Sequence, residues 1–193
     1  MTEGLKPGDR LRDLDLQAHN EEVRAVWDAF HRRRPLRPPV ILGTNTRFFM
    51  LNPACNTGGL EFKAYTEDPA LMFHALLEFQ RWSRFNLLQD AELGLPKEWS
   101  LAVDFQNYYE AAWFGCLVEY PPGQVPDTRP GFSEFPESLL EKGLPDPFGG
   151  LMGRGWECHE AFSALSAGEG YLGRPVRVQA PGLGVGTDGP LTV

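Results

Sequence analysis

The sequence predicts an α/β fold organised around a parallel β-sheet. Short apolar runs of strand length alternate along the chain with longer segments in which apolar residues recur at helical spacing. Strands that alternate with helices are joined by right-handed crossovers and therefore run parallel. The chain has 193 residues, enough for roughly one domain, and 42% of them are hydrophobic and 23% charged, as is usual for globular rather than disordered proteins.

The chain opens with residues 1–19, a polar stretch of mixed charge that we expect to form a flexible arm. The domain itself is expected over residues 20–193 and starts with a helix. Asn20 is a good N-cap residue, acidic residues follow it in the first turn, and apolar residues then recur at helical spacing. Pro35 ends this helix after three consecutive arginines, which we interpret as a solvated last turn.

Two more elements are expected in the first half of the chain. The apolar run at residues 40–42 is bounded by proline and glycine and is too short for a helix, so it predicts a buried strand. Residues 52–66 contain a proline and two adjacent glycines and are expected to form a loop. Asp68 then caps a long helix over residues 69–86, whose apolar stripe is explained by core packing alone.

The second half repeats the alternation of strand and helix. Residues 99–103 predict a strand, and residues 117–120 could form another. Residues 121–147 are rich in proline and are expected to form a long irregular excursion. A last helix over about residues 155–167 and a strand over residues 176–180 complete the pattern.

Charge and composition exclude several classes of function. Eighteen basic side chains against 26 acidic ones give a net charge of -8, which argues against a nucleic-acid or anionic-membrane binder. The sequence shows neither a leader peptide nor an apolar run of about 18 residues, so we predict no membrane span and a cytoplasmic location. Cys55, Cys116 and Cys158 are odd in number and widely spaced, which predicts no disulfide framework. The cysteines and the four histidines form no paired metal signature, so no metal ligand is predicted in this chain.

Asp104 is the strongest candidate for a chemical role. It comes directly after the predicted strand over residues 99–103, and Tyr108 follows close behind. In a parallel sheet, groups at the carboxyl ends of the strands face the substrate site. The alternative is a structural cap for the segment that follows, a role that Asp often fills. The pattern leaves both interpretations open.

Residues after the other two strands would complete the same rim. Asn45 and Arg47 follow the first strand, where an arginine can hold a substrate carboxylate by two parallel hydrogen bonds or pair with a nearby acidic residue. Thr187 and Asp188 follow the last strand, inside residues 184–189, which match the dinucleotide-binding fingerprint. Nothing follows this match that could hold the ribose, so a tight turn above the strand is the favoured interpretation.

Three segments resemble the uroporphyrinogen decarboxylase superfamily and occur in that family's order: Pro38-Pro-Val-Ile-Leu-Gly43, Val103-Asp-Phe-Gln-Asn-Tyr-Tyr-Glu-Ala-Ala-Trp-Phe-Gly115 and Gly186-Thr-Asp-Gly-Pro-Leu-Thr-Val193. The similarity extends from about residue 20 to the end. It implies an incomplete (β/α)8 TIM barrel, of which this chain is the N-terminal portion, with about three parallel strands and flanking helices. We expect the barrel to be completed by a missing C-terminal half or by a second copy in a homodimer.

The resemblance also implies roles for individual residues. Asp104 matches the aspartate that hydrogen-bonds the pyrrole N–H groups of the tetrapyrrole and stabilises the cation formed before carbon dioxide leaves. Arg47 matches the second of two arginines that bind substrate carboxylates, and Gly43 replaces the first. With Asn45, Tyr108, Thr187 and Asp188 as further substrate-binding residues, the implied activity is that of a lyase. It would act on a carboxylate-rich tetrapyrrole or related small molecule without an organic cofactor, and we expect this chain alone to be inactive.

Two other functions remain open. The chain could be a relative of the superfamily's methyltransferases, which move methyl groups between corrinoids and thiols. Zinc would then be held by His and Cys ligands of the missing C-terminal half. Alternatively, the chain could be a non-catalytic fragment that folds only with a partner.

Overall fold

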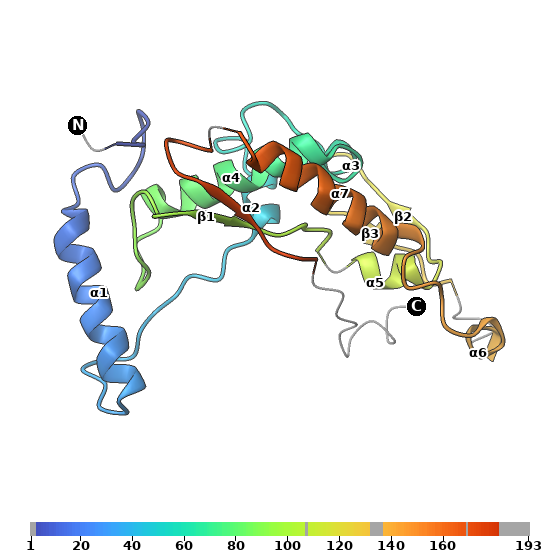
Figure 1. Cartoon of the computed structure of the whole chain (residues 1–193), viewed down its shortest axis with the longest axis horizontal. Helices are drawn as coiled ribbons and strands as arrows, with labels where there is room; N and C mark the ends of the chain where they lie inside the picture. The colour runs from blue at the N-terminus through green and yellow to red at the C-terminus, as the bar shows by residue number, and fades with distance from the viewer. Residues whose placement is uncertain (1–2, 107, 132–136, 169, 182–193) are drawn as a thin grey trace.

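The structure, a computed structural model, describes residues 3–106, 108–131, 137–168 and 170–181 (Figure 1). Thr187, Asp188 and the glycine-rich segment around them lie outside the described residues. The helices and strands in chain order are α1 (Leu16–His31), α2 (Thr46–Leu51), α3 (Phe62–Glu67), α4 (Pro69–Asn86), β1 (Trp99–Leu101), α5 (Tyr108–Trp113), β2 (Val118–Glu119), β3 (Asp127–Thr128), α6 (Glu137–Lys142), α7 (Gly150–Ser166) and β4 (Val176–Val178).

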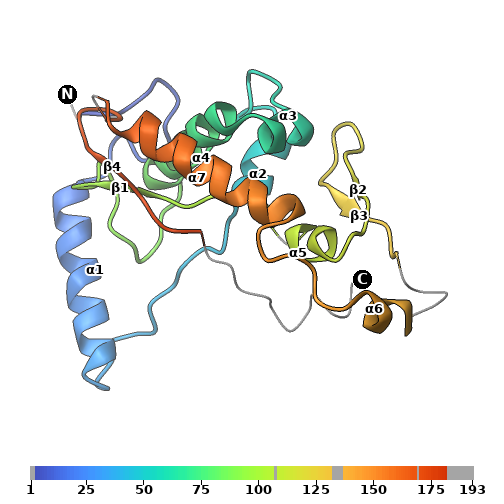
Figure 2. The same ribbon diagram turned by 45° about the vertical axis from the view of Figure 1, so that its right-hand side comes forward.

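The centre of the fold is a parallel pair of short strands covered by two long helices. β1 and β4 run parallel with Trp99 opposite Val176 and Leu101 opposite Val178. Helix α4 contacts β1, helix α7 contacts β4, and the two helices contact each other. Figure 2 shows this strand pair near one end of α7, and α5 with the β2–β3 hairpin near the other. The described residues thus form a mixed α/β structure that is mostly helical.

The core lies between the strand pair and the two helices. The side chains of Trp99 and Leu101 are almost completely buried, while Ser100 between them is exposed, as the two-residue period of a strand requires. From the helices, Phe73 of α4 meets Phe162 of α7 edge to face with ring centroids 5.3 Å apart.

Several predicted elements are confirmed. Helix α4 covers the predicted residues, with Pro69 in its first turn, and the side chain of Asp68 accepts hydrogen bonds from the backbone N–H groups of Ala70 and Leu71. The strands predicted over residues 99–103 and 176–180 form β1 and β4, each three residues long. The possible strand at residues 117–120 is the short β2, which pairs antiparallel with β3 inside the predicted irregular excursion.

The predicted strand at residues 40–42 is wrong. Val40 forms two hydrogen bonds with Asp90 in the loop that follows α4: its carbonyl accepts from the Asp90 N–H at 2.8 Å, and its own N–H donates to the Asp90 side-chain carboxylate at 2.6 Å. Val40, Ile41 and Leu42 remain 57%, 51% and 44% exposed. The described residues therefore contain two parallel strands where about three were expected, and no barrel is seen among them.

Four short helices of the described residues were not predicted, and two helix boundaries differ. Helix α5 follows β1, and α6 lies within the stretch predicted as an irregular excursion. Helix α2 begins directly after Asn45, and α3 lies within the stretch predicted as a loop over residues 52–66. Helix α1 starts earlier than Asn20 because the side chain of Asp15 accepts from the N–H groups of Gln17 and Ala18. Helix α7 starts at Gly150 rather than near residue 155.

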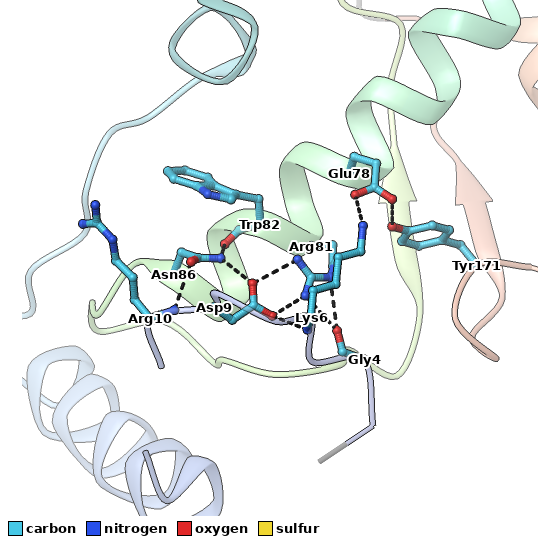
Figure 3. Close-up of polar contacts among 9 residues, drawn as sticks. All are labelled: Gly4, Lys6, Asp9, Arg10, Glu78, Arg81, Trp82, Asn86 and Tyr171. Atoms are coloured by element: carbon cyan, nitrogen blue, oxygen red, sulfur yellow. Dashed lines mark hydrogen bonds and ion pairs between the residues drawn. The ribbon is translucent and has the colours of Figure 1, made fainter. Parts of the chain in front are cut away.

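The N-terminal segment is anchored to α4, although residues 1–19 were expected to form a flexible arm (Figure 3). The Asp9 carboxylate forms an ion pair with Arg81, and both side chains are at most 5% exposed. Asn86 also donates to Asp9 at 3.0 Å, and two nitrogens of Arg81 donate to the Gly4 carbonyl. Lys6 reaches Glu78, which accepts a second bond from Tyr171 at 2.6 Å. Gly4, Lys6 and Asp9 are therefore fixed to α4 by polar contacts, while the proposed domain boundary at residue 20 stays a prediction.

Within the described part of the chain, no helix has the length and apolar character needed to cross a membrane.

Candidate functional site

Asp104 lies three residues beyond the end of β1 and accepts several hydrogen bonds. Its Oδ2 accepts from the hydroxyl of Thr46 at 2.9 Å and from the hydroxyl of Tyr65 at 3.0 Å. Its Oδ1 accepts from the backbone N–H of Gln106 at 3.0 Å. An ionised carboxylate can only accept hydrogen bonds, so these donors suit a charged side chain held in one position.

The two hydroxyl donors come from the short helices that the sequence reasoning missed. Thr46 is the first residue of α2, whose N-terminus is capped by the side chain of Asn45 through the Phe48 N–H at 3.3 Å. Tyr65 belongs to α3 and is fully buried. Burial raises the pKa of Tyr65 well above its usual value, and the nearby Asp104 carboxylate raises it further. Tyr65 therefore remains protonated and serves as a donor to Asp104.

Arg47 approaches Asp104 through Gln106. The Arg47 Nε donates to the side-chain carbonyl of Gln106, and the Gln106 amide nitrogen lies 3.4 Å from Asp104 Oδ2. A single neutral side chain thus touches both the guanidinium and the carboxylate. Gln106 has a backbone φ of 59°, in the left-handed region that side chains other than glycine rarely adopt.

Tyr108 lies on the first turn of α5, near the Asp104 carboxylate and the Arg47 guanidinium. Its hydroxyl is 2.7 Å from that of Thr66, and both residues are buried. Burial raises the pKa of Tyr108 above its usual value, whereas the hydrogen bond with Thr66 and the charge of Arg47 act in the opposite direction. Tyr108 therefore stays neutral at physiological pH.

A cavity of about 130 Å³ opens beside Asp104. Asp104, Gln106 and Tyr109 give it a polar side, and Phe105, Leu151 and Met152 are among its apolar walls. The first turns of α7 reach the cavity through Gly155, where an added Cβ would come within 3.7 Å of the Phe105 ring. The site therefore combines a fixed carboxylate and an amide with apolar walls suited to a small organic ligand.

The structure brings Asp104 and Arg47 together through Gln106, and neither Arg47 nor Tyr108 lines the cavity. It places Asn45 at the N-terminus of α2 as a cap, and Asn45 does not line the cavity. Thr46 and Gln106, which the sequence reasoning missed, are neighbours of predicted residues in the chain, so the two motifs already contained them.

The structure also contains a hydrogen bond that fits the alternative role of Asp104 as a cap. Its bond to the N–H two residues later is the local turn that Asp side chains commonly form. However, α5 begins four residues after Asp104, at Tyr108, and the bonds to Thr46 and Tyr65 come from distant segments. Asp104 thus shapes the turn after β1 and also joins α2 and α3 to it.

No group of three or more His, Cys, Asp or Glu side chains in the described ranges could hold a metal ion. The three cysteines are free thiols, in agreement with the absence of a predicted disulfide framework. Cys158 is completely buried in α7, and burial raises the pKa of its thiol. Zinc was expected only with ligands from a further half of the protein, and this expectation stays a prediction.

Comparisons of the chain with models of known protein families, with curated proteins and with solved structures found no match.

Proposed function

We propose that this chain provides the Asp104 side of a decarboxylase site that acts on a small carboxylate with a ring N–H group, in the manner of the uroporphyrinogen decarboxylase superfamily. The observation that carries the proposal is the juxtaposition of Asp104 and Arg47, bridged by Gln106, at the carboxyl end of a parallel strand. The same proposal includes the fold, as the N-terminal portion of a (β/α)8 barrel.

The fixed charge of Asp104 supports a role in stabilising a cation. Protonation of an electron-rich ring gives a cation, and loss of carbon dioxide then returns the electron pair of the broken C–C bond to the ring. In the net reaction, one proton takes the place of the carboxylate. A carboxylate that is already held by Thr46, Tyr65 and the Gln106 N–H needs little reorganisation when this positive charge develops.

Arg47 supports binding of the carboxylate that leaves or of a second one. Its planar guanidinium matches a carboxylate in shape. Because Arg47 and Asp104 carry opposite charges, a ligand with both an acidic group and an N–H donor would find a partner for each.

A parallel pair with Asp104 just beyond its carboxyl end supports the barrel, since substrate sites of such barrels lie at that end of the strands. The exposed edges of the pair would be covered by further strands.

Carbon dioxide release tests the proposal. The chain, supplied with the remaining part of the protein where one exists, is incubated with uroporphyrinogen and, separately, with pyrrole-2-carboxylate. Asp104→Asn keeps the size of the side chain but removes its charge, so release is expected to fall by about 10²- to 10³-fold. The matched control is Asp28→Asn on the exposed side of α1, which should leave the rate unchanged. Equal rates for wild type and Asp104→Asn would refute the proposal.

One observation favours a second candidate, a non-catalytic chain that works only with a partner. The extended segment at residues 40–42 exposes three consecutive large apolar side chains, which is unusual for a chain that stays alone in solution. Sedimentation of the purified chain checks this candidate. A monomer that unfolds cooperatively would exclude it, whereas association that is lost in Ile41→Ser would support it.

A further inference from the structure

The connection between α1 and α2 presents an apolar surface. Figures 1 and 2 show this part of the chain as an extended stretch between the two helices. Besides the exposed side chains at residues 40–42, Leu36 is 77% exposed and Leu88 is 60% exposed. Leu88 directly precedes Gln89 and Asp90, which bond to the 40–42 segment. Large apolar side chains grouped in this way are typical of a surface that another molecule covers.

Only one edge of the 40–42 segment is hydrogen-bonded within the chain. Both backbone groups of Val40 bond to Asp90, and the Leu42 N–H donates to the side chain of Gln89 at 2.9 Å. Successive residues of an extended chain direct their backbone groups to opposite sides, so those of Ile41 face away from Gln89 and Asp90. Among the described residues, none forms a hydrogen bond with the Ile41 backbone. An open edge of this kind can pair with a strand from a peptide.

Three prolines make the connection suitable for such pairing. Pro35, Pro38 and Pro39 have no N–H to donate, and each holds the preceding residue in an extended conformation. Pairing is therefore centred on Ile41 rather than spread along the whole connection. Because the prolines already restrict the chain, it loses little conformational freedom when a partner binds.

A basic cluster lies at the start of the connection, where α1 ends. Arg32, Arg33 and Arg34 are exposed, and no ion pair within the described ranges includes Arg33 or Arg34. Arg32 lies 3.8 Å from Asp28, and both of these side chains are exposed as well. Arg33 has a φ of 57° at a position where helices commonly end on glycine. These arginines therefore provide positive charge next to the apolar surface in a chain whose net charge is -8.

We propose that residues 32–42 bind an extended acidic peptide segment of a partner protein. Its backbone would pair with Ile41, its apolar side chains would cover residues 40–42, and its carboxylates would bind the arginines. Seven residues of extended chain separate Arg34 from Ile41, roughly 23 Å, so a peptide of about eight residues reaches both. The open backbone edge favours a peptide over a nucleic acid or a membrane, because neither of these can continue a strand. The proposal rests on the second candidate function, a chain that works with a partner, and does not depend on the Asp104 site.

Fluorescence anisotropy with synthetic peptides tests the proposal. Two labelled peptides of about ten residues are titrated with the full chain. One carries alternating valine and threonine before a run of glutamates, and the other has the reverse order, so that both strand directions are covered. At least one should bind, with an affinity that falls as salt is added, and its counterpart with lysine in place of glutamate should not bind. Failure of both acidic peptides to bind, or equal binding of the lysine counterpart, would overturn the proposal.

Variants of the surface separate its charge from its backbone edge. Arg33→Glu/Arg34→Glu is expected to weaken binding of the acidic peptide at least about tenfold. The matched control is Arg12→Glu/Arg177→Glu, which changes the net charge equally at two other exposed arginines and should leave the affinity within about twofold. Ile41→Pro removes the open N–H and should weaken binding about three- to tenfold. Full affinity in a folded Arg33→Glu/Arg34→Glu, or an equal loss in the control, would contradict the proposed surface.

The other possible occupants have their own readouts. Flotation of wild type with phosphatidylserine vesicles, or self-association that is lost in Ile41→Pro, would overturn the proposal if the acidic peptides do not bind. The surface lies outside the cavity beside Asp104, so carbon dioxide release by Arg33→Glu/Arg34→Glu should equal that of wild type. The peptide titration and the carbon dioxide assay can therefore fail independently of each other.

Discussion

Removing Asp9 is expected to destabilise the fold strongly, because Arg81 would be left buried without its partner. Asp9 and Arg81 are 5% and 3% exposed, and the pair connects the N-terminal segment to α4 (Figure 3). Breaking such a buried pair from one side typically costs about 3–5 kcal/mol. In a chain of this length that corresponds to a drop in melting temperature of about 10 °C. We therefore expect Asp9→Ala to lower the free energy of unfolding by about 3–5 kcal/mol.

Urea unfolding followed by tryptophan fluorescence and circular dichroism measures the loss. The double variant Asp9→Leu/Arg81→Met replaces both charges with apolar groups and should recover at least half of it, since no unpaired charge is then buried. The exposed pair formed by Arg24 and Glu92 is the matched control, and Glu92→Ala should cost less than about 1 kcal/mol. A loss below about 1 kcal/mol for Asp9→Ala would show that this ion pair does not hold the N-terminal segment to α4 and would refute the reasoning.

Two further predictions concern acid stability and the tight turn at residues 170–174. The Arg37 side chain donates to Asp90, and this bond together with the Val40 N–H lowers the pKa of Asp90 to about 2. Because the folded pKa is the lower one, the contribution of Asp90 is fully present above about pH 4 and is lost as the pH falls towards 2. Asp90→Asn should reduce the loss of unfolding free energy between about pH 4 and pH 2, as measured by urea unfolding. An unchanged loss would contradict the contribution given to Asp90. Gly170→Ala should destabilise the chain by about 1–3 kcal/mol, since φ is 77° and the new Cβ would lie 2.2 Å from the Arg174 carbonyl. Gly168→Ala, with 3.7 Å to its nearest neighbour, is the control in the same melting experiment, and equal melting temperatures for the two variants would argue against the close approach.

Helix α4 shows what the sequence could predict. Asp68, Pro69 and the apolar stripe are local signals, and they agree with the core that the helix joins. The strands were predicted by the same kind of signal, a short apolar run between breakers. For β1 and β4 the run lies against α4 and α7 and forms a pair.

The run at residues 40–42 carries the same signal but has no strand beside it. Its backbone groups bond to Gln89 and Asp90 instead. Whether an apolar run becomes a strand depends on a partner that comes from elsewhere in the chain, which the run itself does not encode. The anchoring of the N-terminal segment was missed for the same reason, since Asp9 meets Arg81 across 72 residues.

The sequence offered candidate residues for the site because its motifs are local. Asp104 and Arg47 were identified from their positions after strand-like segments, and the structure brings both to Gln106. Tyr65 could not be identified in this way, because only the folding of residues 62–67 into α3 directs its hydroxyl to Asp104. The donors that hold a charge are long-range contacts, and a single sequence does not reveal them.

The central claim is that Asp104 and Arg47 act on the same ligand. It is tested most directly by following the Arg47 Nε–H resonance in a ¹⁵N-edited NMR spectrum while pyrrole-2-carboxylate is added. The account predicts a saturable shift of this resonance that pyrrole does not cause and that Asp104→Asn weakens. Binding of pyrrole-2-carboxylate with no change at Arg47 would contradict it.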